Sequence, residues 1–271
     1  MKNVGSQTAG VTDRVQASEK TLKGLRRFNA IMGFFHLVQG ILMIVLSNDA
    51  TYPFTTAYLK FDLDTFKLSS NLQNAGELLF GPAVAVFLLL SAVAHFSLAT
   101  FGYKWYVSNL KKGMNPARFY EYALSSSLMI VLIAMLVGMW DIPSLILMFS
   151  LNAMMNLFGH MMELHNQTTP RTDWTSFIYG CIAGIVPWVA IVMYLIGAAQ
   201  SVDANPPAFV YAIIASIFVF FNIFAVNMFL QYKKVGAWKD YLFGERMFIV
   251  LSLVAKTALA WQIFAGTLAP V

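Results

Sequence analysis

Seven long stretches of this sequence are apolar and almost free of charge, and they constrain the fold more than any other feature. Each has about the 20 residues with which an α-helix crosses a hydrocarbon layer of roughly 30 Å. The third and fourth stretches are separated by Trp140-Asp141-Ile142-Pro143, where the proline indicates a tight turn. We predict membrane spans at residues 28–47, 77–101, 117–140, 144–162, 174–198, 208–231 and 243–269.

The composition leads to the same fold class. Hydrophobic residues make up 58% of the 271 and charged residues only 11%, whereas a soluble domain carries about 25% charged residues. We therefore expect an all-α membrane protein with lipid around most of the chain. Residues 1–27 are polar and basic and lack the apolar core of a signal peptide. They are expected to form a cytoplasmic N-terminal arm before a membrane domain over residues 28–271.

The basic residues predict the orientation. If the N-terminus lies in the cytoplasm, fifteen of the eighteen Lys and Arg residues face that side, two lie outside, and Lys256 lies within a span. Such an asymmetry favours an inside N-terminus, and an odd number of spans then places the C-terminus outside. The net charge of +5 is thus expected to face anionic lipid of the cell membrane, and we expect no nucleic-acid partner.

The loop over residues 48–76 is too long for a simple connection between two spans. Within it Leu59, Phe61 and Leu63 alternate with charged residues, which is the period of a half-buried strand. We predict an extracellular β-ribbon. Its apolar face needs a cover, either the protein's own helices or a second copy of the chain.

Lys256 lies near the middle of the last span, where an ionisable side chain costs about 2.5–3.5 kcal/mol on insertion scales. Burial favours the neutral amine, a nucleophile whose natural partner is an aldehyde, so a Schiff base is expected. A protonated Schiff base needs a counterion within the bilayer. Glu121 is the only carboxylate that we place clearly within a span.

The third span presents Glu121 in a defined setting. Asn115-Pro116 is typical of a helix start. Arg118, Glu121 and Ser125 share one helix face, and Ser252 lies one turn before Lys256. We expect a site with a cation, a carboxylate and two hydroxyls, provided that the lysine side chain points towards the cytoplasm.

Seven spans with a lysine in the last, and an Arg-x-x-acid motif opening the third, are typical of microbial rhodopsins. More specifically, the chain resembles the heliorhodopsins over residues 25–271. The segments that carry the resemblance are residues 118–134 (RFYEYALSSSLMIVLIA) and 252–256 (SLVAK). The inside N-terminus and the long outer loop are similar to that family as well.

The resemblance implies a photoreceptor with all-trans retinal as its chromophore. Lys256 would carry retinal as a protonated Schiff base, Glu121 would be the counterion, and Ser125 and Ser252 would lie close to it. His36 and His95 would line a polar, proton-accepting cavity on the cytoplasmic side, where we also expect Arg118. The resemblance also implies a homodimer joined through the long outer loop, and a slow photocycle.

The rest of the chromophore pocket is expected to be apolar, because a polyene needs a long apolar slot. Candidate lining residues from the third, fifth and sixth spans are Met129, Trp188, Phe218 and Phe221. His160, Glu163 and His165 have the residue types of a metal site, but their spacing gives poor ligand geometry, so we expect no metal. Cys181 lies in an apolar run and is expected to be a buried, unreactive thiol.

Three functions are compatible with these features. The first is a light sensor that signals to a cytoplasmic partner without pumping ions. The second is a light-driven proton or ion transporter or channel. It is disfavoured because Leu132 stands where outward proton pumps carry an acid. The third is a retinal-free transporter or receptor with a buried Lys256–Glu121 ion pair. An enzyme is not expected, because no nucleophile–base constellation appears.

Overall fold

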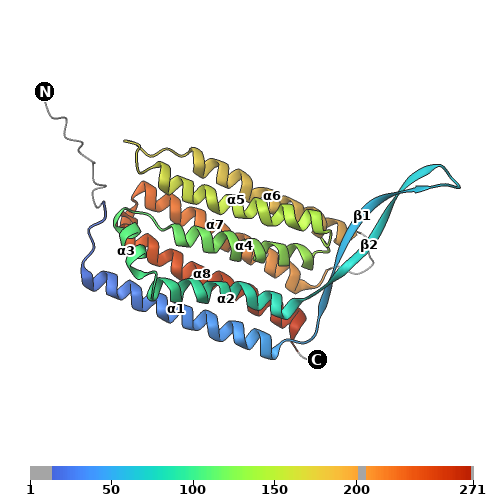
Figure 1. Cartoon of the computed structure of the whole chain (residues 1–271), viewed down its shortest axis with the longest axis horizontal. Helices are drawn as coiled ribbons and strands as arrows, with labels where there is room; N and C mark the ends of the chain where they lie inside the picture. Colours follow the sequence, from blue (N-terminus) through green and yellow to red (C-terminus); the bar gives the residue numbers. More distant parts are fainter. Residues whose placement is uncertain (1–13, 201–205, 270–271) are drawn as a thin grey trace, which may run out of the picture.

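The computed structural model describes residues 14–200 and 206–269. Within these residues, seven helices are long and apolar enough to cross a membrane, as the sequence predicts. They alternate in direction and pack side by side, with a two-stranded ribbon at one end of the bundle (Figure 1). The seven are α1 (Glu19–Leu46), α2 (Phe80–Ala99), α4 (Pro116–Leu136), α5 (Ile142–His165), α6 (Thr175–Gln200), α7 (Ala208–Lys233) and α8 (Tyr241–Ile263), which a π-helical turn (Phe264–Leu268) extends.

Side-chain caps set the starts of α4 and α5. Asn115 caps α4 by accepting a hydrogen bond from the Arg118 amide (3.4 Å), with Pro116 at the first helical position as predicted. Asp141 caps α5 in the same way, accepting from the Ser144 amide at 3.0 Å. The predicted turn between these helices is confirmed, although α4 ends at Leu136, four residues earlier than the hydropathy suggests.

The opposite end of the bundle holds structure that the hydropathy pattern does not predict. The first helix begins at Glu19, so residues 19–27 of the expected arm are helical. A short helix, α3 (Tyr103–Lys111), connects α2 to α4, and its buried Tyr106 and Leu110 pack against Leu25 of α1. A 3-10 turn, η1 (Gly236–Lys239), connects α7 to α8. We call this the α3 end of the bundle and the other the ribbon end.

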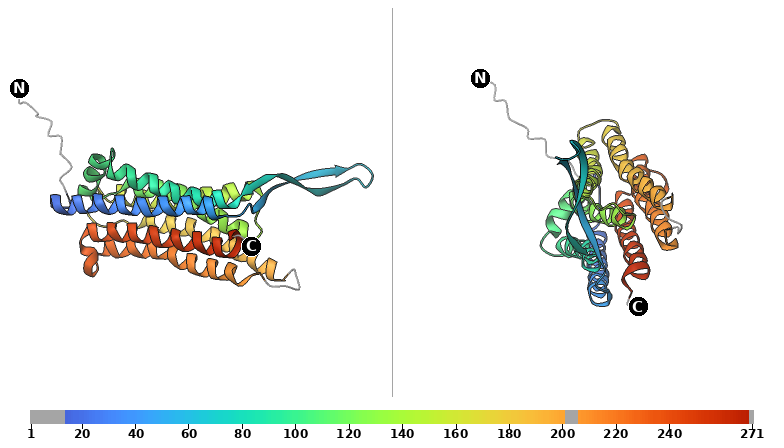
Figure 2. Two further views of the ribbon diagram at one scale, coloured as in Figure 1. Left: turned by 90° about the horizontal axis from the view of Figure 1, so that it is seen from below. Right: turned by 90° about the vertical axis from the view of Figure 1, so that its right-hand side faces the viewer.

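The expected ribbon is confirmed and is longer than the alternation suggested. Strands β1 (Thr51–Asp62) and β2 (Lys67–Leu79) pair antiparallel from Thr51↔Leu79 to Asp62↔Lys67. The Thr55 amide donates to the Trp140 carbonyl (2.9 Å), which attaches the base of the ribbon to the α4–α5 turn. Beyond that base the ribbon projects away from the helices (Figures 1 and 2).

The distal ribbon is amphipathic and uncovered. One face carries the exposed side chains of Leu59, Phe61, Leu68 and Leu72. Lys60 and the residues two positions away from it along β1 occupy the other face. Alternating strand residues point to opposite faces, so the apolar side chains form one stripe. Of the two expected covers, the chain's own helices reach only the base of the ribbon.

The bundle core is apolar towards the ribbon end. Helix α4 is the most buried span, and its last turns, including Leu132 and Met135, belong to the main apolar core cluster. The expectation for Cys181 is wrong, since this residue is exposed on the outer surface of α6. An apolar run around a cysteine indicates lipid or protein surroundings equally, and here the side chain faces outward.

Candidate functional site

Lys256 and Glu121 lie side by side in the bundle interior. Lys256 Nζ donates to Glu121 Oε1 at 2.7 Å, and the two side chains are 3% and 9% exposed. They come from α8 and α4, and the lysine side chain reaches towards the α3 end, as the depth difference between the two residues requires. A cation and a carboxylate this close and this buried neutralise each other, which an intramembrane charge needs.

A serine on α2 completes this pair, and the sequence reasoning missed it. Ser91 Oγ donates to Glu121 Oε1 at 2.7 Å and accepts from Lys256 Nζ at 2.5 Å. Ser252 Oγ, one turn before the lysine on α8, accepts from Nζ at 3.1 Å. The signal that could have identified Ser91 is its spacing of four residues from His95, which puts both polar side chains on one face of an otherwise apolar helix.

Ser125 is one turn from Glu121 on α4 and is fully buried. In the described part of the chain its hydroxyl has no hydrogen-bond partner. The structure brings the Ser252 hydroxyl onto the lysine, and Ser91 adds a second hydroxyl beside it.

The two histidines lie together next to this pair. The rings of His36 and His95 stack with centroids 5.6 Å apart and an interplanar angle of 11°. His95 Nδ1 is 2.8 Å from Asn29 Oδ1, whereas both ring nitrogens of His36 lack a partner among the described residues. Buried polar atoms are normally satisfied, so His36 is a polar group that is available to water or to a proton.

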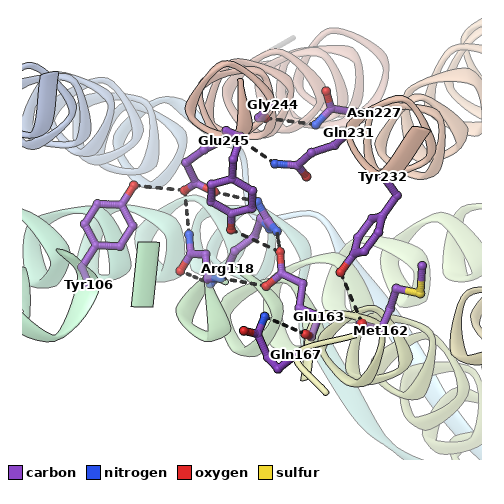
Figure 3. Close-up of polar contacts among 12 residues, drawn as sticks. Tyr106, Arg118, Met162, Glu163, Gln167, Asn227, Gln231, Tyr232, Gly244 and Glu245 are labelled. Atoms are coloured by element: carbon purple, nitrogen blue, oxygen red, sulfur yellow. Dashed lines mark hydrogen bonds and ion pairs between the residues drawn. The ribbon is translucent and has the colours of Figure 1, made fainter. Parts of the chain in front are cut away.

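Arg118, which shares a helix face with Glu121, makes its ion pairs with two other carboxylates. Its guanidinium donates to Glu163 Oε1 (2.5 Å) and to Glu245 Oε2 (2.7 Å), as Figure 3 shows. The expectation that Glu121 is the only carboxylate clearly inside a span is wrong, because Glu163 and Glu245 are each 1% exposed. Sequence position suggested interfacial carboxylates at span ends, but helix α3 and its neighbours enclose that end of the bundle.

Arg118 still lines a cavity with His95, as expected. This small cavity is bordered by His95, Arg118, Glu121, Glu245 and Ser252, among others. It therefore extends from the Lys256–Glu121 pair to Arg118 and Glu245.

A second cavity begins at Lys256 and is mostly apolar. Met129 and Phe221 line it, together with Met155 and Asn156 of α5, which the sequence did not single out. Met155, Asn156 and Phe221 also border an adjoining cavity that Trp188 lines. Phe218 contacts the Trp188 ring edge-on at 5.2 Å but lines neither cavity.

These residues fit a polyene aldehyde such as retinal. A primary amine lies at the end of an apolar slot, and a carboxylate sits where a positive nitrogen needs compensation. Within the described residues no group of three metal-ligating side chains is present.

Solved structures with the same fold are microbial-type rhodopsins. A light-driven proton pump from Leptosphaeria maculans matches with a TM-score of 0.65 at 15% identity, covering 93% of this chain and 97% of that one. Cyanorhodopsin from a Tolypothrix cyanobacterium matches with a TM-score of 0.59 at 12% identity, covering 93% and 96%. The transmembrane domain of a Salpingoeca rosetta rhodopsin phosphodiesterase gives 0.62 at 16%, covering 91% and 84%. At these identities the likeness establishes the fold alone.

No curated protein sequence matches this chain significantly. The heliorhodopsin family model, in contrast, matches residues 25–268, which is nearly the whole chain. On this match and on its seven-helix bundle, the chain belongs to the heliorhodopsin family.

Proposed function

We propose that this protein is a light sensor that holds all-trans retinal on Lys256 and signals through a slow photocycle without pumping ions. The observation that carries the proposal is the buried contact of 2.7 Å between Lys256 Nζ and Glu121 Oε1 at the end of an apolar slot. When bound, retinal supplies a conjugated Schiff base that absorbs visible light and isomerises.

The chain's own residues supply the rest of the site. Glu121 stabilises the positive charge on the lysine nitrogen, and Ser91 and Ser252 fix the position of both groups by hydrogen bonds. Met129, Phe221 and Trp188 exclude water from the slot. His36 and His95, which stack beside this pair, are the groups that we propose accept a proton.

Sensing is favoured over pumping by the distribution of polar groups along the bundle. The cavity that adjoins the Lys256–Glu121 pair leads towards the α3 end. Towards the ribbon end, the described side chains of the α4 core, including Leu132, are apolar and fully buried. A pump needs a relay on both sides of its site, and the described residues of α4 beyond Glu121 include no acidic or basic side chain.

We further propose that the α3 end faces the cytoplasm and that two copies join through the apolar stripe of the ribbon. The basic residues of the connections at the α3 end support this orientation. The uncovered Leu59, Phe61, Leu68 and Leu72 support a second copy as the cover, with the signal read by a cytoplasmic partner. The proposal assigns no enzymatic activity to the chain.

An absorption spectrum tests the proposal directly. The protein expressed with all-trans retinal should show a visible band that is absent from Lys256→Ala, whereas Lys104→Ala, which alters a lysine outside the spans, should keep the band. A folded but colourless wild type would contradict retinal binding and would favour the retinal-free ion pair.

Photocurrent recording separates the sensor from the transporter. Cells that express the coloured protein should show no light-dependent current beyond that of the Lys256→Ala variant. A current that depends on Lys256 would overturn the non-pumping function while leaving retinal binding intact.

A further inference from the structure

A second group of charges is buried at the α3 end, apart from the Lys256 site. Arg118 of α4 lies between Glu163 of α5 and Glu245 of α8 and donates to both (Figure 3). The arginine side chain is 3% exposed and each carboxylate 1%. We call these three residues the Arg118 cluster. Its composition is unbalanced, because two carboxylates face a single guanidinium.

The hydrogen-bond partners of the two carboxylates do not supply a second positive charge. Glu245 Oε1 accepts from the Tyr106 hydroxyl (3.0 Å) and from Asn115 Nδ2 (2.7 Å). Glu163 Oε2 accepts from the Asn115 amide (2.7 Å), and the Tyr241 hydroxyl lies 3.3 Å from Oε1. All of these partners are neutral. Burial beside Glu245 raises the pKa of Tyr106 well above its usual value of 10, so this phenol keeps its proton.

Among the described residues, no cation other than Arg118 makes a hydrogen bond or ion pair with either carboxylate. Arg14 donates to the carbonyl oxygens of Asn166 and Gln167. His160 packs against the rings of Phe119 and Tyr120. On the remaining helices, Tyr122 donates to the Phe248 carbonyl and Tyr232 to the Met162 carbonyl, and Glu121 is matched by Lys256. With every member ionised, the cluster would therefore hold one uncompensated negative charge.

An uncompensated charge in a buried site is relieved most simply by a proton. Two carboxylates in one buried site with too little positive charge repel each other, and a proton on one of them removes that repulsion. A second observation indicates that this proton can exchange through the cavity inside the bundle. Arg118 Nε has no acceptor among the described residues, and Arg118 and Glu245 both line the cavity that reaches Glu121 and Ser252.

We propose that the Arg118 cluster binds one exchangeable proton, shared between Glu163 and Glu245, and that the cavity connects this site to the Lys256–Glu121 pair. A carboxylate oxygen accepts the proton from water to form a carboxylic acid, with no change of oxidation state. The use of this proton in a light response rests on the proposed function, but its presence in the resting protein does not.

Infrared spectroscopy of the retinal-free protein tests the proposal. The protein is expressed without retinal, purified in an ester-free detergent and measured at neutral pH, where exposed carboxyl groups are ionised. We expect a carbonyl band of one protonated carboxylic acid that shifts on transfer to heavy water. Glu163→Gln and Glu245→Gln should each remove the whole band, because the remaining carboxylate is then matched one to one by Arg118. Glu77→Gln, the same change at an exposed position of β2, should leave it intact.

The absence of the band from the wild type would overturn the proposal. A band that persists in both glutamine variants would assign the proton to another residue and would overturn it too. Loss of the band in only one variant would show a fixed acid and not a shared proton. A protein that shows the band in its retinal-free form but stays colourless when it is expressed with retinal would refute the proposed function alone. A protein that becomes coloured with retinal but lacks the band in its retinal-free form would refute this inference alone.

Discussion

Replacement of Arg118 by methionine should destabilise the protein by an amount that depends on pH. The guanidinium contacts Glu163 at 2.5 Å and Glu245 at 2.7 Å, with all three side chains buried. Methionine keeps much of the volume but removes the cation. Both carboxyl groups must then be neutral in the folded variant, whereas the wild type needs only one of them to be protonated.

The size of the effect follows from the cost of that additional proton. An exposed glutamate has a pKa of about 4.3, and each pH unit above it costs about 1.4 kcal/mol if the group must stay protonated. The variant should therefore lose about 3.7 kcal/mol of unfolding free energy at pH 7 and about 1 kcal/mol at pH 5. The sign follows because the folded variant binds one proton more than the folded wild type, while their unfolded chains bind equal numbers, so the loss of stability grows as pH rises. The value at pH 7 lies within the range of about 3–5 kcal/mol for breaking a buried ion pair.

Reversible unfolding in mixed detergent micelles, followed by circular dichroism at pH 5, 6 and 7, measures this difference. Arg171→Met removes the same charge from an exposed position in the α5–α6 connection and should change stability by less than about 0.5 kcal/mol. A loss for Arg118→Met that is equal at pH 5 and pH 7 would refute the electrostatic reasoning and would indicate a packing effect. A loss below about 1 kcal/mol at pH 7 would show that the cluster is not enclosed as described.

Three further outcomes are expected. Glu121→Gln should move the visible absorption maximum to longer wavelength, because the carboxylate no longer stabilises the ground-state charge; an unchanged spectrum would assign the counterion to another group. Replacing His36 or His95 with phenylalanine should change the lifetimes of photocycle intermediates in flash photolysis by several-fold and leave the colour nearly unchanged; a colour shift as large as that of Glu121→Gln would refute their separate role. Leu59→Ser with Leu68→Ser should weaken dimers in light scattering by at least tenfold, since each buried leucine contributes about 1.5–3 kcal/mol; equal weakening by substitutions on the ribbon's polar face would argue against the stripe as the interface.

The features that could be predicted are those that residues close together in the sequence determine. Seven apolar runs, a proline turn and an alternating strand pattern can each be recognised from neighbouring residues alone. Lys256 was recognisable because an uncompensated lysine in an apolar run has few structural explanations. Glu121 was predicted as its partner because the lysine needs a carboxylate within the membrane.

The features that were missed depend on which side chains meet in space. Ser91 is an ordinary serine in an apolar helix, and only the packing of α2 against α4 brings it to Glu121. Glu163 and Glu245 lie near span ends, where carboxylates are usually solvated. Their burial depends on helix α3, whose sequence Tyr103–Lys111 is too short and too polar to register as a span. The partners of Arg118 could therefore not be chosen from spacing alone.

The Lys256–Glu121 pair and the Arg118 cluster differ in their ratio of positive to negative side chains. The Lys256–Glu121 pair is matched one to one, so it is electrically neutral without a bound proton. The Arg118 cluster is not matched, and the cavity between the two sites is lined by members of both, including Glu121, Arg118 and Glu245. Any change that weakens the Lys256–Glu121 contact alters the field at the cluster, which is bordered by Tyr106 of α3 and Tyr241 at the start of α8. Under the proposed sensing function, we therefore expect the response to a disturbance at mid-membrane at the α3 end and not in the apolar core at the ribbon end.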